Sequence, residues 1–313
     1  MRQLQQELFV MFTVNFAHSI KSILEQFMAI NILKRAGNTE QEELTFVDHL
    51  EALRWHIVRS LLAVIVFAIV IFLNIDWVFD KIILGPLRPD FVSYIYMCRI
   101  SHWLHLGDAL CMPAIKATLQ TTAFSAMFMS SITIGFVGGF IAAFPYVFWE
   151  FWRFVKPALK PSELRSTRGS IFFVTFFFFM GAAFGYFLLA PFTFNFLSNY
   201  TMGTAQILEA KPTLNDYIEN LVNIVIGCGL AFELPVLSYV LTKIGLITPQ
   251  FLKAYRKYAI LIILVVAAVI TPSPDWTSQL LVFIPLFLLY QLSIGVSRRA
   301  YRDMQKKDAE EWS

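Results

Sequence analysis

Charged residues and cysteine are scarce in this sequence. Of its 313 residues, 15% are charged and three are cysteine, whereas 57% are hydrophobic and 16% are aromatic. A soluble globular domain carries about 25% charged residues. The composition therefore excludes a soluble domain and indicates a polytopic membrane protein. Because apolar runs extend nearly from end to end, no stretch remains for a separate soluble catalytic domain.

Catalytic motifs are also lacking. The sequence has no serine–histidine, cysteine–histidine or metal-ligand set at a usable spacing, and no glycine-rich nucleotide-binding loop. No cleavable signal peptide is recognisable. We therefore expect no enzymatic activity, no cofactor, no metal and no nucleic-acid partner.

Six apolar segments predict an all-α integral membrane protein. A hydrocarbon core of about 30 Å needs about 20 helical residues to cross it. The predicted spans are residues 61–73 with their margins, 128–148, 171–189, 221–241, 258–270 and 280–295. The last two spans are short, which predicts local thinning of the bilayer or shielding by neighbouring helices. Together the six spans form a membrane domain over residues 57–295.

The remaining segments flank or interrupt this domain. Residues 1–43 read as an amino-terminal extension with an interfacial helix and a polar linker, although a further span or a spurious upstream start remains open. Residues 44–56 predict an amphipathic cytosolic helix, because Phe46, Leu50, Leu53 and Ile57 form one apolar stripe. Residues 76–120 form a long external loop, and residues 296–313 form a basic and then charged tail.

Basic residues predict the orientation in the membrane. Two of the connections and the tail are rich in lysine and arginine, whereas residues 190–220 contain only Lys211 and residues 271–279 contain none. By the positive-inside rule, both termini lie in the cytoplasm. The basic residues are Arg153, Lys156, Lys160, Arg165 and Arg168, then Lys243, Lys253, Arg256 and Lys257, and in the tail Arg298, Arg299, Arg302, Lys306 and Lys307.

Glu233 is the one strong intramembrane acid of the predicted spans. A charge at bilayer depth is costly and normally faces a protein interior or a wet cavity, so Glu233 is a candidate functional residue. Pro235 cannot donate a helical hydrogen bond and predicts a break beside it. A proton-coupled secondary transporter that uses Glu233 is one hypothesis. Against it, no matching interruption occurs in an inverted second half.

Four short motifs make the chain recognisable. They read HLEALR at 49–54, FVKPALKPSE at 154–163, FELP at 232–235 and TPSPD at 271–275. Their order and setting resemble the twin-arginine translocase subunit TatC family over residues 45–301. The resemblance implies a receptor in the bacterial inner membrane that binds twin-arginine signal peptides of folded proteins. It also implies small single-span partners of the TatA and TatB type, and transport driven by the proton-motive force.

The resemblance also implies which residues function. Its signal-peptide surface corresponds to Phe154, Pro157, Leu159 and Glu163, its intramembrane acid to Glu233, and its outer polar residues to Thr271 and Gln279. The family pattern has an acid directly before the leucine of Leu53-Arg54, where this chain has Ala52 and carries its acid at Glu51. The expected peptide-binding set is Glu51, Leu53, Arg54, Phe154, Pro157, Leu159, Glu163 and Arg165, and the expected intramembrane polar set is Glu233, Pro235, Thr271, Asp275 and Gln279.

Cys98 and Cys111 lie in the external loop, on the side opposite the basic connections. His102 and His105 suggest a metal site as an alternative, but the spacing is not a standard ligand pattern. In an oxidising compartment the two cysteines can pair, whereas Cys228 lies within a predicted span and fits a small apolar filler.

We expect Cys98 and Cys111 to be oxidised to each other, which in the chain-entropy model contributes about 3 kcal/mol. Thiol-blocking reagent applied to the unreduced protein should modify one cysteine at most. Cys98→Ser is the matched control, because it should release Cys111 for modification. Three reactive cysteines in the parent would contradict the pairing.

Overall fold

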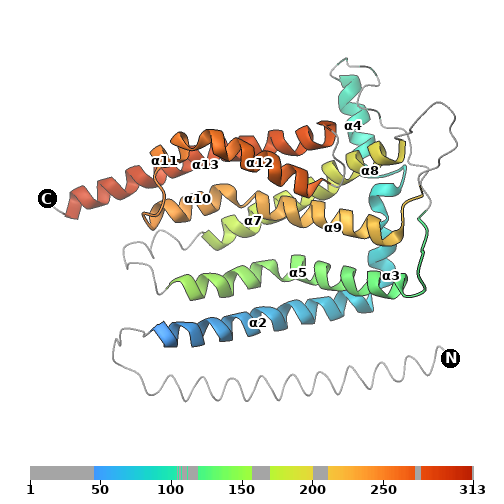
Figure 1. The fold of residues 1–313 in the computed structure, drawn as a ribbon, viewed down its shortest axis with the longest axis horizontal. Coiled ribbons are helices and arrows are strands. Elements are labelled where there is room, and N and C mark those ends of the chain that lie inside the picture. The colour runs from blue at the N-terminus through green and yellow to red at the C-terminus, as the bar shows by residue number, and fades with distance from the viewer. Residues whose placement is uncertain are drawn as a thin grey trace. The chain divides into compact units, whose positions relative to one another are not determined.

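The computed structural model describes residues 46–103, 105, 107, 111, 119–156, 170–199, 211–271 and 276–311. These residues are helical apart from turns and one isolated bridge between Gln120 and Thr213. The chain divides into two compact units, Met1–Glu51 and Ala52–Ser313. The helical bundle described below lies in the second unit (Figure 1).

Among the described residues, five helical stretches are long and apolar enough to cross a membrane. They are Glu51–Leu73, Ala126–Val155, Ile171–Asn199, Leu214–Lys243 and Gln279–Lys306. The remaining predicted span corresponds to α12 (Arg256–Ile270), whose 15 residues give a length of about 22 Å, short of the hydrocarbon thickness of about 30 Å. The predicted all-helical membrane fold is therefore confirmed.

Two helices extend beyond the predicted segments. α2 runs unbroken from Phe46 to Leu73, so the amphipathic segment 44–56 and the first span belong to one helix. α13 (Trp276–Glu311) continues past the sixth predicted span through most of the predicted tail. Neither junction contains a proline, and Gly295 alone costs a helix only about 1 kcal/mol.

The other helices follow in chain order. α5 covers Ala126–Val155, and α7 (Ser170–Phe184) continues through the π-helical turn η4 (Gly185–Leu189) into α8 (Ala190–Asn199). α9 (Leu214–Ala231) and α10 (Leu234–Lys243) are separated by a break, and α11 covers Pro249–Ala254. α10 packs along α13 and α7 along α9, while α5 contacts both α7 and α9 (Figure 1).

Glycines allow close approach between helix backbones. A Cβ atom on Gly139 of α5 would lie 2.6 Å from the backbone nitrogen of Ala68 on α2. A Cβ atom on Gly181 of α7 would lie 2.5 Å from the carbonyl oxygen of Cys228 on α9. Small residues are what membrane helices pack on, and these two glycines let the backbones of their helices approach closely.

Tyrosine hydroxyls hold the irregular backbone that follows α2. After α3 (Ile75–Val78) come the π-helical turn η1 (Phe79–Ile83) and the 3₁₀ turn η2 (Gly85–Leu87). Tyr186 donates to the carbonyl of Ile82 at 2.6 Å, and Tyr217 to that of Ile83 at 2.5 Å. Tyr94 of α4 (Val92–Trp103) donates to the carbonyl of Pro86 at 2.7 Å.

Burial raises the pKa of Tyr94 well above its ordinary value. The hydroxyl therefore stays protonated and keeps its role as a donor. Such pairing matters here because an unpaired buried carbonyl carries a desolvation cost.

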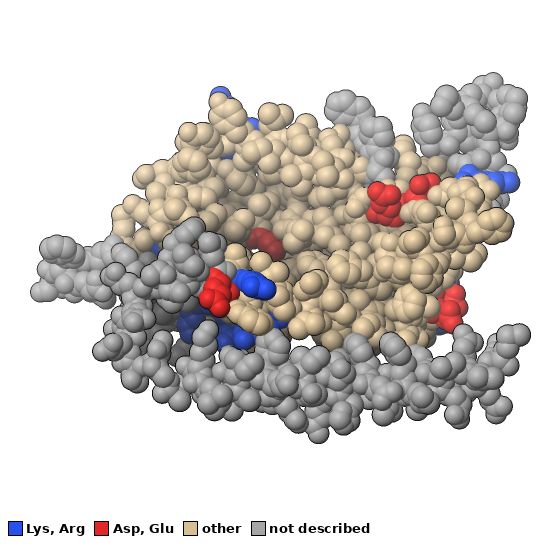
Figure 2. Space-filling view, turned by 60° about the horizontal axis from the view of Figure 1, so that its bottom comes forward, with Lys and Arg blue, Asp and Glu red and all other residues tan. Residues whose placement is uncertain are grey.

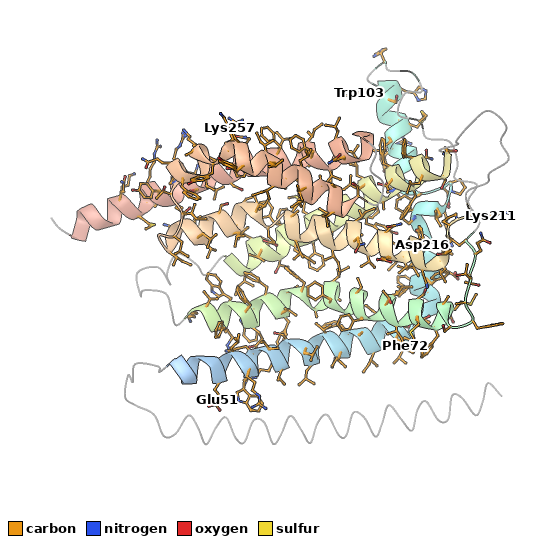
Figure 3. The ribbon with its side chains drawn as sticks, in the orientation of Figure 1. Glu51, Phe72, Trp103, Lys211, Asp216 and Lys257 are labelled. Atoms are coloured by element: carbon orange, nitrogen blue, oxygen red, sulfur yellow. A yellow bond between two sulfur atoms is a disulfide. The ribbon has the colours of Figure 1, made fainter. Side chains whose placement is uncertain are left out.

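Charged side chains gather toward the ends of the bundle. Figure 2 shows uncharged residues over most of one face and charged residues mainly toward its two ends. In Figure 3, Lys257 lies toward one end, and Trp103, Lys211 and Asp216 lie at the opposite end. This is the arrangement expected of helices that cross an apolar layer.

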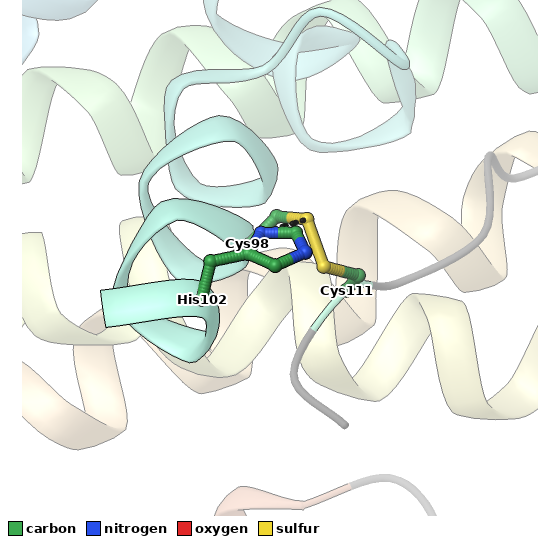
Figure 4. A group of neighbouring side chains, drawn as sticks. All are labelled: Cys98, His102 and Cys111. Carbon is green, nitrogen blue, oxygen red and sulfur yellow. Dashed lines mark hydrogen bonds between the residues drawn. A yellow bond between two sulfur atoms is a disulfide. The ribbon is translucent and has the colours of Figure 1, made fainter. Parts of the chain in front are cut away.

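Cys98 and Cys111 are joined by a disulfide in the structure, with Cα atoms 4.3 Å apart (Figure 4). His102 Nδ1 lies 3.9 Å from the sulfur of Cys98, so three possible metal ligands gather here. A thiolate is the form of cysteine that binds a metal. In the disulfide state, therefore, this cluster lacks the ligands of a zinc site.

Candidate functional site

Four residues expected to bind a signal peptide lie on α2 and α5. Leu53 is half-buried and Arg54 exposed on α2, and Phe154 is half-buried in the last turn of α5. Glu51 is also exposed on α2. Pro157, Leu159, Glu163 and Arg165 lie outside the described residues, as does Asp275 of the expected intramembrane set.

An apolar groove brings Leu53 and Phe154 together between α2 and α5. Its volume is about 330 Å³. Its walls are almost entirely aliphatic and aromatic, so it suits an apolar side chain or helix and not an ion. The lining residues are Leu53, His56, Ile57, Ser60, Leu61 and Val64 from α2, and Phe136, Phe140, Val147, Phe151 and Phe154 from α5.

A polar contact links the two helices beside this groove. His56 Nδ1 of α2 lies 2.5 Å from Glu150 Oε2 of α5. The side chain of Glu150 is 1% exposed and that of His56 is 17% exposed. The His56 ring also contacts the Phe154 ring edge-on, with centroids 6.2 Å apart. This contact therefore fixes the positions of Leu53 and Phe154 relative to each other.

The second oxygen of Glu150 is also occupied. Tyr146 donates its hydroxyl to Glu150 Oε1 at 3.1 Å. Arg153 Nη1 lies 3.6 Å from the same oxygen, and its guanidinium lies over the Trp149 ring at 4.9 Å. A buried carboxylate is tolerated when its oxygens are paired. Glu150 is thus a positioning group in the structure, already engaged by its neighbours.

Sequence reasoning missed Glu150. The predicted span ends at residue 148, two residues before Glu150, so the sequence points to Glu233 as the one strong acid in the spans. The sequence does carry a signal for it: Glu150 stands within the aromatic run Trp149–Trp152, and a carboxylate among apolar residues near a span needs a partner. Its partner was not readable, since His56 lies 94 residues away.

The His56 contact bears on the unusual Ala52. Residues four apart on a helix are neighbours on one face, so His56 follows Ala52 by one turn on the same face of α2. Among the described side chains, the acid that contacts His56 on this face is Glu150 of α5. The side chain of Glu51 leaves the helix in a direction about 100° away from that of Ala52.

Glu233 lies at the break between α9 and α10. Its backbone forms the N-cap of α10, and Pro235 stands in the first turn of that helix. The predicted break beside Pro235 is therefore confirmed. Among the described residues, Glu233 Oε1 is buried without a hydrogen-bond partner. A buried polar atom of this kind is a position where a partner can gain a hydrogen bond.

Thr271 and Gln279 lie where α12 ends and α13 begins. Thr271 is buried and donates to the carbonyl of Ala267 at 2.9 Å, and Gln279 donates to that of Leu264 at 3.3 Å. Both side chains bond to carbonyls of α12. In the described part of the chain the structure does not join them to Glu233 as one polar site.

Together, these features define a helical membrane protein with surfaces for binding partners. The described residues form a helical membrane bundle with an apolar groove, a buried acid–histidine contact and an intramembrane glutamate, Glu233, with one unpaired oxygen. They present surfaces for binding and no nucleophile paired with a base.

Comparisons with known proteins identify the family. The model of the Sec-independent protein translocase protein family (TatC) matches residues 48–285. The chain is 39% identical over 259 residues to a Sec-independent protein translocase protein TatC of Blattabacterium sp. subsp. Periplaneta americana, covering 82% of this chain and 96% of that protein. It is 32% identical to the TatC of Carboxydothermus hydrogenoformans, covering 83% and 95%.

A solved structure agrees with the fold. A crystal structure of a twin-arginine translocase receptor, TatC, superposes with a TM-score of 0.62 at 32% identity, covering 80% of this chain and 99% of that one. The chain belongs to the TatC family. The predicted resemblance is confirmed, and so is the expectation of a translocase component in place of an enzyme.

We predict that the His56–Glu150 contact stabilises the α2–α5 pair. His56→Leu leaves a buried carboxylate without its closest partner, so it should cost about 3–5 kcal/mol of folding free energy. The double variant His56→Leu with Glu150→Leu should be more stable than His56→Leu alone, because it also removes the buried carboxylate that has lost its closest partner. Thermal unfolding of the purified protein in detergent measures both effects.

The matched control for this prediction is Glu219→Gln. Glu219 is an exposed acid on α9, and its replacement should change stability by less than about 0.5 kcal/mol. If His56→Leu unfolds at the same temperature as Glu219→Gln, the contact does not hold the helices.

Proposed function

We propose that this chain is the receptor subunit of a twin-arginine translocation system, which binds Arg-Arg signal peptides of folded precursors. The observation that carries the proposal is the fold agreement with a solved twin-arginine translocase receptor over 80% of this chain. The groove between α2 and α5 supports it, because two of the expected peptide-binding residues, Leu53 and Phe154, line the same surface.

The peptide's arginine pair would bind at the polar end of this surface. Guanidinium groups pair with carboxylates through two parallel hydrogen bonds. Glu150 is occupied by His56 and Tyr146, so the contacts fall to Glu163 and Glu51. Arg54, Pro157, Leu159 and Arg165 complete the proposed surface, and Leu53 and Phe154 supply its apolar part.

The proposed orientation places this surface in the cytoplasm of a bacterium, on the inner membrane. α5 ends, α10 ends and α12 begins with basic residues, so the positive-inside rule supports cytoplasmic termini. The basic residues at these three helix ends are Arg153, Lys156, Lys243, Arg256 and Lys257.

The proposed partners besides the peptide are small single-span proteins of the TatA and TatB type, further copies of this chain and the lipid bilayer. The unpaired Oε1 of Glu233 supports a partner contact within the membrane. Pro235, Thr271, Asp275 and Gln279 belong to this proposed contact region. Transport itself would draw on the proton-motive force.

We predict that Glu163 contacts the arginine pair. Glu163→Ala should weaken peptide binding by about 1–3 kcal/mol, the cost of losing a charge-assisted hydrogen bond. Glu163→Arg should weaken it further through repulsion. Crosslinking of an Arg-Arg precursor to the detergent-solubilised protein measures the effect.

A Lys-Lys precursor is the control, because an ammonium cannot reproduce the planar bidentate contact. Binding of both precursors equally would count against the receptor proposal itself. If Arg-Arg binding is selective yet both Glu163 variants bind like the parent, Glu163 is not the contact and Glu51 takes its place.

We predict that Glu233 acts through a hydrogen bond to a partner helix and not through bulk proton flow. Glu233→Gln keeps hydrogen-bonding groups and should retain much of the export activity, whereas Glu233→Ala and Glu233→Leu should lose it. Export of a twin-arginine reporter in cells measures this. Equal loss in the glutamine and alanine variants would show that protonation is essential.

A further inference from the structure

A second, cationic pocket lies where α11 and the start of α12 meet α13. Its volume is about 470 Å³, within the usual range of about 300–1,000 Å³ for ligand sites. It is distinct from the groove between α2 and α5, since no lining residue is shared. The lining residues are Lys253, Arg256, Gln291, Ile294, Gly295 and Arg298.

The pocket orients one of its cations. With its amide oxygen facing the guanidinium, Gln291 accepts from Arg256 Nε at 3.1 Å and from Nη2 at 2.9 Å. The same guanidinium lies over the Phe287 ring, 5.5 Å from its centroid. Arg256 is thus held from two sides, which lowers the entropy lost when it binds a ligand.

The cations of the pocket are not neutralised by its walls. Lys253, Arg256 and Arg298 supply three positive charges, and none of the described residues that line the pocket is an aspartate or glutamate. The ion pairs among the described residues involve Glu150 on α5. Three converging cations without a counter-charge attract an anion.

Gly295 keeps the floor of this pocket open. A Cβ atom placed on it would meet nothing within 4 Å. Here glycine is not needed for close helix packing, unlike Gly139 or Gly181. A larger side chain at this position would fill the pocket without changing any charge.

The apolar surface beside the pocket indicates the kind of anion. Ile284, Leu288 and Leu292 are exposed on α13 by 54%, 56% and 58%, and their spacing of four places them on one face. This stripe leads to Gln291 and Gly295 on the same helix. The apolar part of α12 begins directly after Lys257, so the pocket lies at the edge of the apolar zone.

We propose that this pocket binds the phosphate group of an anionic phospholipid. Arg256 and Arg298 donate to the phosphate oxygens as planar forks, and Lys253 adds a third cation. The acyl chains lie along Ile284, Leu288 and Leu292. Basic pockets between helices at a membrane surface recognise such headgroups. A soluble anion would use the cations but not the apolar stripe.

The test measures lipid binding by the full chain. The protein is delipidated in detergent and then given phosphatidylglycerol or phosphatidylcholine, and native mass spectrometry quantifies the retained lipid. The parent should prefer phosphatidylglycerol. Arg256→Gln with Arg298→Gln should reduce that binding about 10- to 30-fold, because each cation near an anionic surface contributes about a factor of five.

Two further variants separate a built site from general surface charge. Gly295→Leu keeps every charge and should reduce phosphatidylglycerol binding about tenfold by filling the pocket. Lys257→Gln removes an exposed cation that does not line the pocket and should leave binding close to that of the parent. Circular dichroism and unfolding temperature show that each variant is folded.

Three results would overturn the proposal. In the first, Gly295→Leu binds phosphatidylglycerol as well as the parent does. In the second, Lys257→Gln weakens phosphatidylglycerol binding as much as the double arginine variant does. Either result would show that the pocket is not the site. Inorganic phosphate could raise the unfolding temperature as much as phosphatidylglycerol at the same phosphate concentration, which would assign the pocket to a free anion. None of these results depends on signal-peptide binding.

Discussion

Helices inside a bilayer gain little from excluding water between them, because lipid tails are as apolar as their side chains. This bundle therefore depends on close contact between backbones at small residues. Gly139 admits Ala68 of α2, and Gly181 admits the Cys228 carbonyl of α9. Large aromatic side chains are left facing outward, and Phe172 is 71% exposed. The glycine contacts set the distance and rotation of α2, α5, α7 and α9, and hence which polar groups can meet.

The second constraint is that buried backbone and polar groups need hydrogen-bond partners. Two irregular stretches of the described chain meet it differently. Next to η1, the hydroxyls of Tyr186 and Tyr217 supply donors for exposed carbonyls. At the α9–α10 break, Pro235 removes a donor and the adjacent Glu233 has an oxygen that the described residues leave unpaired. The first region is satisfied within the chain, whereas the second is suited to a partner.

Charge divides the basic end of the bundle into two kinds of surface. Beside the α2–α5 groove, the Glu150 carboxylate is already paired with His56 and Tyr146, so it gives rigidity to an apolar recognition surface. Between α12 and α13, Arg256 and Arg298 face a pocket with no acid among its described lining residues. A peptide with an apolar segment suits the first surface and an anion suits the second. The two surfaces can be occupied together because they share no residue.

The sequence by itself determined the membrane class, the approximate spans, the family and the break beside Pro235, because composition, segment length and local backbone chemistry decide these properties. It did not reveal that α2 and α13 are continuous, since no proline or strong break marks the boundaries expected there. It also missed the pairing of His56 with Glu150 and of Arg256 with Gln291. Such pairs join distant residues, and they depend on how each helix is rotated about its axis. In helices that are apolar on nearly every side, periodicity does not show that rotation; only packing at contacts such as Gly139 with Ala68 decided it.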